Sequence, residues 1–89
     1  MFSSWGVETI RAYTEEDIRN ALNALVDEAQ YGVVLRAKGI VAGADGRWIH
    51  FDYVPGDIDV RYGGADVIGK LCVIGADIHE NALKSLFGV

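Results

Sequence analysis

YGVVLRAKGIVAG, residues Tyr31–Gly43, is the stretch that decides the fold of this 89-residue chain. It is the longest apolar run, it is rich in β-branched and aliphatic residues, and glycines bound it, which is typical of a strand. Because strand side chains alternate between two faces, one face is expected to suit a core. That face holds Val33, Leu35, Ala37, Gly39 and Val41. The opposite face is mixed and holds Val34, Arg36, Lys38, Ile40 and Ala42.

A hairpin is expected next, and two loop lengths fit its turn residues, Gly43–Arg47. A two-residue turn at Asp45 and Gly46 would bring His50 to the core face of the first strand. A three-residue loop, residues 44–46, keeps the apolar residues together instead. It pairs Val41 with Ile49, Gly39 with Phe51, Ala37 with Tyr53 and, on the other face, Lys38 with Asp52. Because register follows the hydrophobic pattern, we predict the three-residue loop, with Gly46 in the left-handed conformation.

The residues before this strand predict an edge strand and then a helix. Residues 1–6 are expected to be a disordered or irregular start, and Val7–Tyr13 is predicted to be a strand at an edge of the sheet. Thr14 is a good N-cap with Asp17 at the capping-box position, and Gly32 is the natural end of the helix. The helix carries one apolar stripe, formed by Ile18, Ala21, Leu22, Leu25, Val26 and Ala29.

The residues after the hairpin predict two more strands and a second helix. Strands are expected over Ile58–Tyr62 and over the apolar run Lys70–Gly75, with a glycine-rich loop between them. Asp77 is predicted to cap a final helix. The apolar side of that helix consists of Ile78, Ala82, Leu83, Leu86 and Phe87. The order β-α-β-β-β-β-α predicts a single α+β domain over residues 7–89, an antiparallel sheet of four to five strands with two helices packed on one face.

Composition excludes several classes of protein. The net charge of −5 and the pI of about 4.7 exclude nucleic acid as the main partner, because phosphate binding needs a basic field. No apolar run approaches the roughly 20 residues of a membrane helix, and the first residues do not form a signal peptide. We therefore expect no membrane partner and a cytoplasmic location. The single cysteine, Cys72, cannot form an internal disulfide, and the sequence contains no phosphate-binding P-loop.

The face of the sheet that the two helices leave uncovered is the candidate site. It is expected to hold Arg36, Lys38, Trp48, His50, Asp52, Asp59 and Arg61. One interpretation is a solvated surface with a cross-strand ion pair between Lys38 and Asp52. The other is an interface for a neighbouring domain or a partner, because tryptophan and arginine are enriched at such surfaces. Both interpretations fit the residues.

Metal binding and catalysis have little support in the sequence. His50 and Asp52 share a face at strand spacing and could form a two-ligand metal patch, but no third ligand is evident. No combination of serine, histidine and aspartate, or of cysteine and histidine, suggests a catalytic centre. We therefore predict a domain that is not an enzyme. Its expected interaction face comprises Arg36, Lys38, Trp48, His50, Asp52 and Arg61.

Several segments together resemble the C-terminal domain of the CobW family. The first is Val34–Ile40, VLRAKGI, which is followed by Asp45-Gly46 and a tryptophan-containing strand. The second is Lys70–Asp77, KLCVIGAD, an apolar strand that ends in Ile-Gly and leads into the last helix. The third is the final helix, Glu80–Phe87, ENALKSLF. The likeness therefore covers nearly the whole chain.

The resemblance implies a role within a larger protein. Full-length CobW-like proteins are P-loop GTPases that act as metal chaperones, for example in cobalamin synthesis or metal homeostasis. Their nucleotide site and metal motif belong to the N-terminal domain, so GTP and zinc or cobalt are expected there and no cofactor is expected in this chain. The resemblance thus implies a non-catalytic accessory domain that docks on a P-loop GTPase domain, in cis or in trans, or on a client protein that receives the metal. The alternative is a stand-alone ferredoxin-like module that binds a small molecule or a metal.

Overall fold

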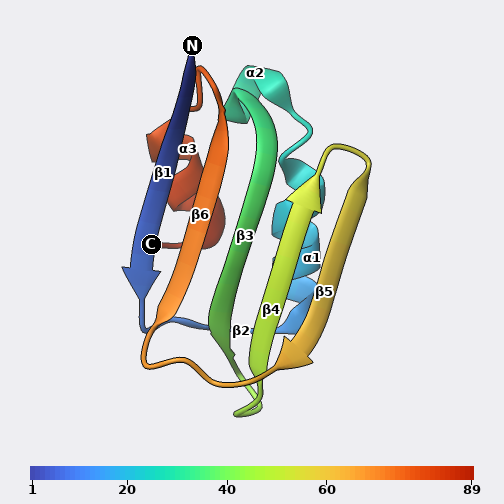
Figure 1. Ribbon diagram of the computed structural model, residues 1–89, viewed down its shortest axis with the longest axis vertical. Coiled ribbons are helices and arrows are strands. Elements are labelled where there is room, and N and C mark those ends of the chain that lie inside the picture. Colours follow the sequence, from blue (N-terminus) through green and yellow to red (C-terminus); the bar gives the residue numbers. More distant parts are fainter.

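All three helices lie on one face of a single sheet (Figure 1). The computed structural model describes residues 1–89. The sheet order is β1-β6-β3-β4-β5 with antiparallel neighbours, and a short strand, β2, pairs in parallel with β3. The elements in chain order are β1 (Phe2–Thr9), β2 (Ala12–Tyr13), α1 (Glu15–Ala24), α2 (Glu28–Tyr31), β3 (Val33–Gly43), β4 (Trp48–Val54), β5 (Asp57–Gly63), β6 (Gly69–Ala76) and α3 (Glu80–Phe87). The predicted α+β fold with helices on one face is confirmed, and the structure adds β2 and α2 to it.

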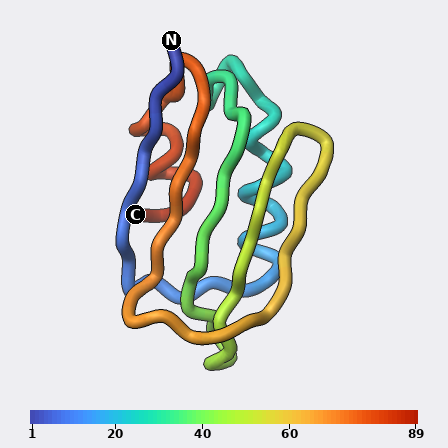
Figure 2. Tube along the Cα trace, in the orientation of Figure 1, coloured from blue at the N-terminus to red at the C-terminus, as the bar shows by residue number.

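The two longer helices cover different halves of the sheet. α1 lies behind β4 and β5, and α3 lies behind β1 and β6 (Figures 1 and 2). The core between the two layers contains only hydrophobic residues, because every buried residue outside the glycines is apolar or aromatic. At its centre the Phe87 ring stacks on Trp5 and on Phe51, each at 6.3 Å between centroids. No helix has both the length and the apolar character that crossing a bilayer requires.

The hairpin between β3 and β4 has the predicted three-residue loop. Val41 lies opposite Ile49, and Lys38 lies opposite Asp52. Gly46 has a φ of +88°, the conformation expected for the last residue of that loop. Gly39 lies opposite Phe51, whose ring occupies the space that a side chain at position 39 would need. The hydrophobic pattern therefore set the register of this hairpin.

A β-bulge in β3 overturns part of the predicted face assignment. The pairing of β3 with β6 shifts by one residue between Val34 and Arg36. Val34 is buried and Leu35 is exposed, the reverse of the prediction, whereas Ala37 is buried as expected. Because a bulge places two residues opposite one, Leu35 and Arg36 both project from the face without helices. Alternation alone cannot show where a strand carries one extra residue.

The N-terminal residues form a strand, so the expectation of an irregular start over residues 1–6 is wrong. β1 pairs with β6 along its whole length and lies at the predicted edge of the sheet, but it begins at Phe2 and ends at Thr9. Only β2, a separate two-residue strand, continues toward Tyr13. Trp5 is 6% exposed, because its indole packs on Phe87 at the far end of the chain. A contact this distant in sequence leaves no local periodicity to detect.

Two helix boundaries also differ from the predictions. Thr14 and Asp17 form the predicted capping box of α1, but the helix ends at Ala24. The Asp27 side chain then accepts a hydrogen bond from the Gln30 N–H and starts α2, which Gly32 terminates with a φ of +84°. At the last helix the N-cap is His79 and not Asp77, which adopts a left-handed φ of +52°. His79 is held there by hydrogen bonds to the backbone carbonyls of α2.

Gly39→Ala is expected to destabilise the domain by about 1–3 kcal/mol, because it adds volume to a packed core. A methyl group at this position would lie 2.5 Å from Cζ of Phe51 and 2.7 Å from the Lys70 carbonyl oxygen. The measurement is the free energy of unfolding in urea. Gly64→Ala is the matched control, because a methyl group there meets no atom within 4 Å. Equal losses for both variants would contradict the packing argument.

Removing one tyrosine hydroxyl is expected to be harmless and removing another costly. The Tyr53 hydroxyl is buried without a hydrogen-bond partner, and burial raises its pKa, so Tyr53→Phe should leave stability unchanged or raise it by up to about 1 kcal/mol. The Tyr13 hydroxyl donates to the Phe87 carbonyl at 2.6 Å, so Tyr13→Phe should cost about 1 kcal/mol. Urea unfolding of the two variants measures the difference. A larger loss of stability for Tyr53→Phe than for Tyr13→Phe would contradict this prediction.

Candidate interaction face

The open face is the side of the sheet that carries no helix (Figure 1). All six residues predicted for the interaction face project from it: Arg36 and Lys38 from β3, Trp48, His50 and Asp52 from β4, and Arg61 from β5. The three basic side chains are exposed, whereas the three side chains from β4 are half-buried. The structure therefore brings the whole predicted set onto one surface.

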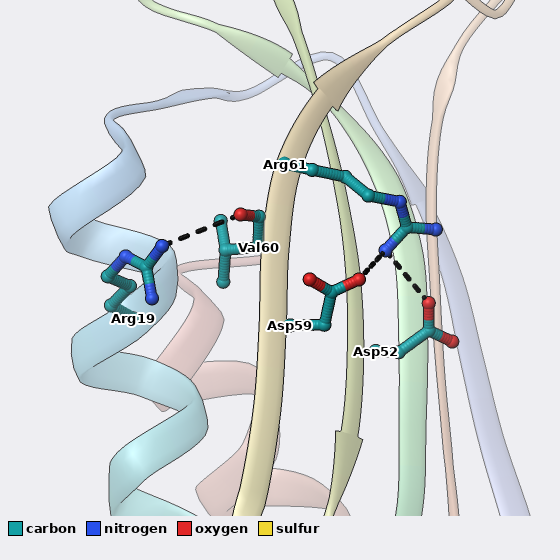
Figure 3. A network of polar contacts seen from close by, with 5 residues as sticks. All are labelled: Arg19, Asp52, Asp59, Val60 and Arg61. Carbon is teal, nitrogen blue, oxygen red and sulfur yellow. Dashed lines mark hydrogen bonds and ion pairs between the residues drawn. The ribbon is translucent and has the colours of Figure 1, made fainter.

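Arg61 bridges two aspartates that would otherwise repel each other. Asp52 and Asp59 are directly opposite in the β4–β5 pairing, a destabilising arrangement for like charges. Nη1 of Arg61 lies 3.1 Å from Oδ2 of Asp52 and 2.5 Å from Oδ2 of Asp59, as Figure 3 shows. The pKa of the guanidinium is raised, first by its hydrogen bond to Asp52. Since all three side chains are about half exposed, the cluster fixes their positions more than it stabilises the fold.

The predicted ion pair between Lys38 and Asp52 does not form. The two residues are directly opposite, as the register prediction required, but no carboxylate lies within 4 Å of the Lys38 ammonium group. The reason is competition, since the guanidinium of Arg61 reaches Asp52 and Asp59 together. Arg36 also has no carboxylate within that distance. The centre of the open face thus presents two unpaired cations.

His50 contacts the loop that follows β5. Its Nε2 lies 2.8 Å from the Gly64 carbonyl oxygen, and its ring lies against the backbone of Gly63. The metal patch considered for His50 and Asp52 would need both side chains to leave these partners, because Asp52 is bonded to Arg61. No group of three or more histidine, cysteine, aspartate or glutamate side chains is arranged to hold a metal ion.

Charge is distributed unequally between the two sides of the molecule. The open face holds four acidic side chains, Glu8, Asp52, Asp57 and Asp59, and four basic ones, Arg36, Lys38, Arg61 and Lys70. Asp66, whose carboxylate lies 3.7 Å from the Lys70 ammonium group, adds a fifth acidic side chain, so the face has a net charge of −1. The other eight acidic and four basic residues carry a net charge of −4. The open face is therefore less negative than the rest of the chain.

One corner of the open face is uncharged, and the sequence alone did not predict it. Near the start of β1 and the end of β6, Phe2 is 72% exposed, and Ile74 and Leu35 are each 40% exposed. Leu35 was predicted to face the core, because alternation does not reveal the bulge in β3. Phe2 was not assigned to a strand, because residues 1–6 were expected to be irregular. One signal in the sequence indicates the outward face of β6. Lys70, Cys72 and Ile74 alternate there with the buried residues Leu71 and Val73.

The family to which the chain belongs is shown by comparison with known protein families. The family described as "Cobalamin synthesis protein cobW C-terminal domain" matches residues 2–89. This chain is a member of the CobW C-terminal domain family. The match confirms the resemblance noted in the sequence and includes the β1 residues that precede Val7. A comparison with curated proteins finds no match.

Solved structures share the fold of this CobW C-terminal domain. The Zn(II)-bound YjiA GTPase from E. coli superimposes with a TM-score of 0.75 at 20% sequence identity. A Zn(II)-bound triple mutant of YjiA GTPase gives a TM-score of 0.76 at 21% identity. Each match covers 98% of this chain and 29% of the YjiA chain. The domain therefore corresponds to less than a third of the length of these GTPases.

Lys38 is expected to replace Arg61 as the partner of Asp52 when the guanidinium is removed. Because Lys38 already faces Asp52, Arg61→Gln alone and Lys38→Met alone should each change stability little. The double variant leaves Asp52 and Asp59 opposite each other without a cation, so its loss should exceed the sum of the single losses. Urea unfolding at low ionic strength measures this double-mutant cycle. Additive losses would contradict the exchange of partners.

Proposed function

We propose that this domain is a non-catalytic docking module of a CobW-family GTPase and that the open face makes the contact. The partner would be a P-loop GTPase domain, in cis or in trans, or a client protein that receives a metal ion. Family membership supports the accessory role, and the fold shared with YjiA GTPase supports the association with a nucleotide-binding domain. The contact surface is inferred from the chemistry of the chain itself.

The observation that carries the proposal is the composition of a sheet face that no helix covers. It presents Trp48 together with the unpaired cations of Arg36 and Lys38. Tryptophan and arginine are the side chains that most often dominate binding energy at protein interfaces. The face is also less negative than the rest of the chain, which reduces the cost of bringing an acidic protein surface against it.

Under this proposal the chemistry of the larger protein lies outside these 89 residues. The GTP site and the zinc or cobalt site would belong to the associated GTPase domain, and the Zn(II) bound to YjiA supports zinc as the metal. In this chain the open face holds ion pairs and a histidine bonded to a backbone carbonyl. That composition suits recognition better than catalysis.

The test measures binding between the 89-residue chain and a purified CobW-family GTPase domain. Trp48→Ala is expected to weaken binding at least tenfold, because truncating a large aromatic side chain removes buried contact area. Arg36→Ala and Lys38→Ala should weaken it less and should reduce its dependence on salt. Isothermal titration calorimetry at two ionic strengths gives both quantities.

Lys84→Ala is the matched control, because Lys84 is an exposed cation on α3 and faces away from the open face. It should bind as the unmodified chain does. Unchanged binding by a folded Trp48→Ala variant would remove the basis of the proposal. Tight binding of Zn(II) by the chain alone would instead favour the alternative of a metal-binding regulatory module.

A further inference from the structure

The two edges of the sheet differ in how well they are protected. β1 forms one edge and β5 forms the other. A sheet edge exposes backbone N–H and C=O groups that can pair with another strand, and folded proteins usually block it with charges, proline or bulges. Comparing β1 with β5 therefore shows which edge is blocked and which is open to pairing.

β5 is blocked in several ways. Asp57, Asp59 and Arg61 place three charges along its seven residues. The Arg19 side chain, which comes from α1, lies 3.5 Å from the Val60 carbonyl oxygen and caps a backbone acceptor (Figure 3). An added strand would have to displace this contact and bury charges, which is costly.

β1 has fewer of these protections, because Glu8, near its end, is its only charge. It pairs with β6 over eight residues without a register shift, and residues 2–7 contain neither a charge nor a proline. No side chain is hydrogen-bonded to the backbone of Phe2–Glu8. The strand is therefore long and regular, and it is uncharged up to Val7, with Glu8 as its one charged residue; an edge of this kind can accept another strand.

The surroundings of β1 would also cover an added strand. Seen down the shortest axis, α3 reaches past β1 at this edge of the sheet (Figures 1 and 2). Inward side chains of a new strand would thus lie over the helix that already buries Trp5 through Phe87. On the open face, the 72% exposed ring of Phe2 would gain an apolar neighbour.

We propose that the free edge of β1 binds an extended, uncharged strand of a partner polypeptide by strand addition. Backbone hydrogen bonds supply the pairing, and the absence of charge from Phe2 to Val7 selects a strand that is itself uncharged there, since a charge on it would find no partner. This contact is separate from the proposed docking through Trp48, which lies on β4.

The experiment uses the 89-residue chain labelled with ¹⁵N and a capped seven-residue peptide of alternating threonine and valine. Amide hydrogen exchange should slow at every second residue of β1 and should not change along β5. Ser4→Lys, which puts a charge on the edge, should weaken peptide binding about tenfold. Ser85→Lys makes the same chemical change on an exposed position of α3 and should have no effect.

A control peptide with proline at alternate positions lacks the N–H groups for pairing and should not bind. Exchange that stays unchanged at β1, or slows on the open face or on β5 instead, would overturn the proposal. A dimer of the free chain that Ser4→Lys converts to a monomer would also overturn it, because the occupant would then be a second copy. Trp48→Ala should leave the β1 result unchanged, so this test and the docking test fail independently.

Discussion

The stack of Trp5, Phe87 and Phe51 is the contact on which the rest of the structure depends. It joins the first strand, the last helix and the central hairpin, with ring centroids 6.3 Å apart in each pair. Phe51 can reach this position only because Gly39, opposite it on β3, has no side chain. The Tyr13 hydroxyl also holds α3 in place, because it donates a hydrogen bond to the backbone carbonyl of Phe87. The two ends of the chain are thereby held against one core.

A chain of this length has enough apolar surface to bury one face of its sheet and not both. The helices cover the inner side, where all the fully buried side chains lie, and the outer side holds a mixture of charged, small, aromatic and aliphatic residues, among them Leu35 and Ile74. The open face differs from an ordinary solvated surface in its two unpaired cations and its tryptophan.

The polar contacts of the open face show how geometry selects among possible partners. The pairing of strands places Lys38 directly opposite Asp52 on one side and Asp59 directly opposite it on the other. Asp52 therefore has two possible cationic partners, Lys38 and the Arg61 that also reaches Asp59. The guanidinium of Arg61 decides the outcome because it reaches both aspartates at once. The same competition leaves Lys38 without an ion pair. A cross-strand position alone therefore does not identify an ion pair.

The sequence by itself determined the features that depend on neighbouring residues. Alternation and turn chemistry were enough for the three-residue loop and the register of Val41 with Ile49, and side-chain capping was enough for the start of α1 at Thr14. These features also placed every predicted residue of the candidate site on one face, and the motifs of the central and last strands identified the family.

Only the tertiary structure decided the features that depend on contacts between distant segments. β1 is a strand because Trp5 packs on Phe87, more than 80 residues away, and the last helix begins at His79 because α2 holds it there. The bulge that turns Leu35 outward arises from pairing with β6, which the sequence of β3 cannot reveal. Local patterns report which backbone conformation a segment prefers, whereas burial, bulges and competing ion partners depend on what the rest of the chain brings beside it.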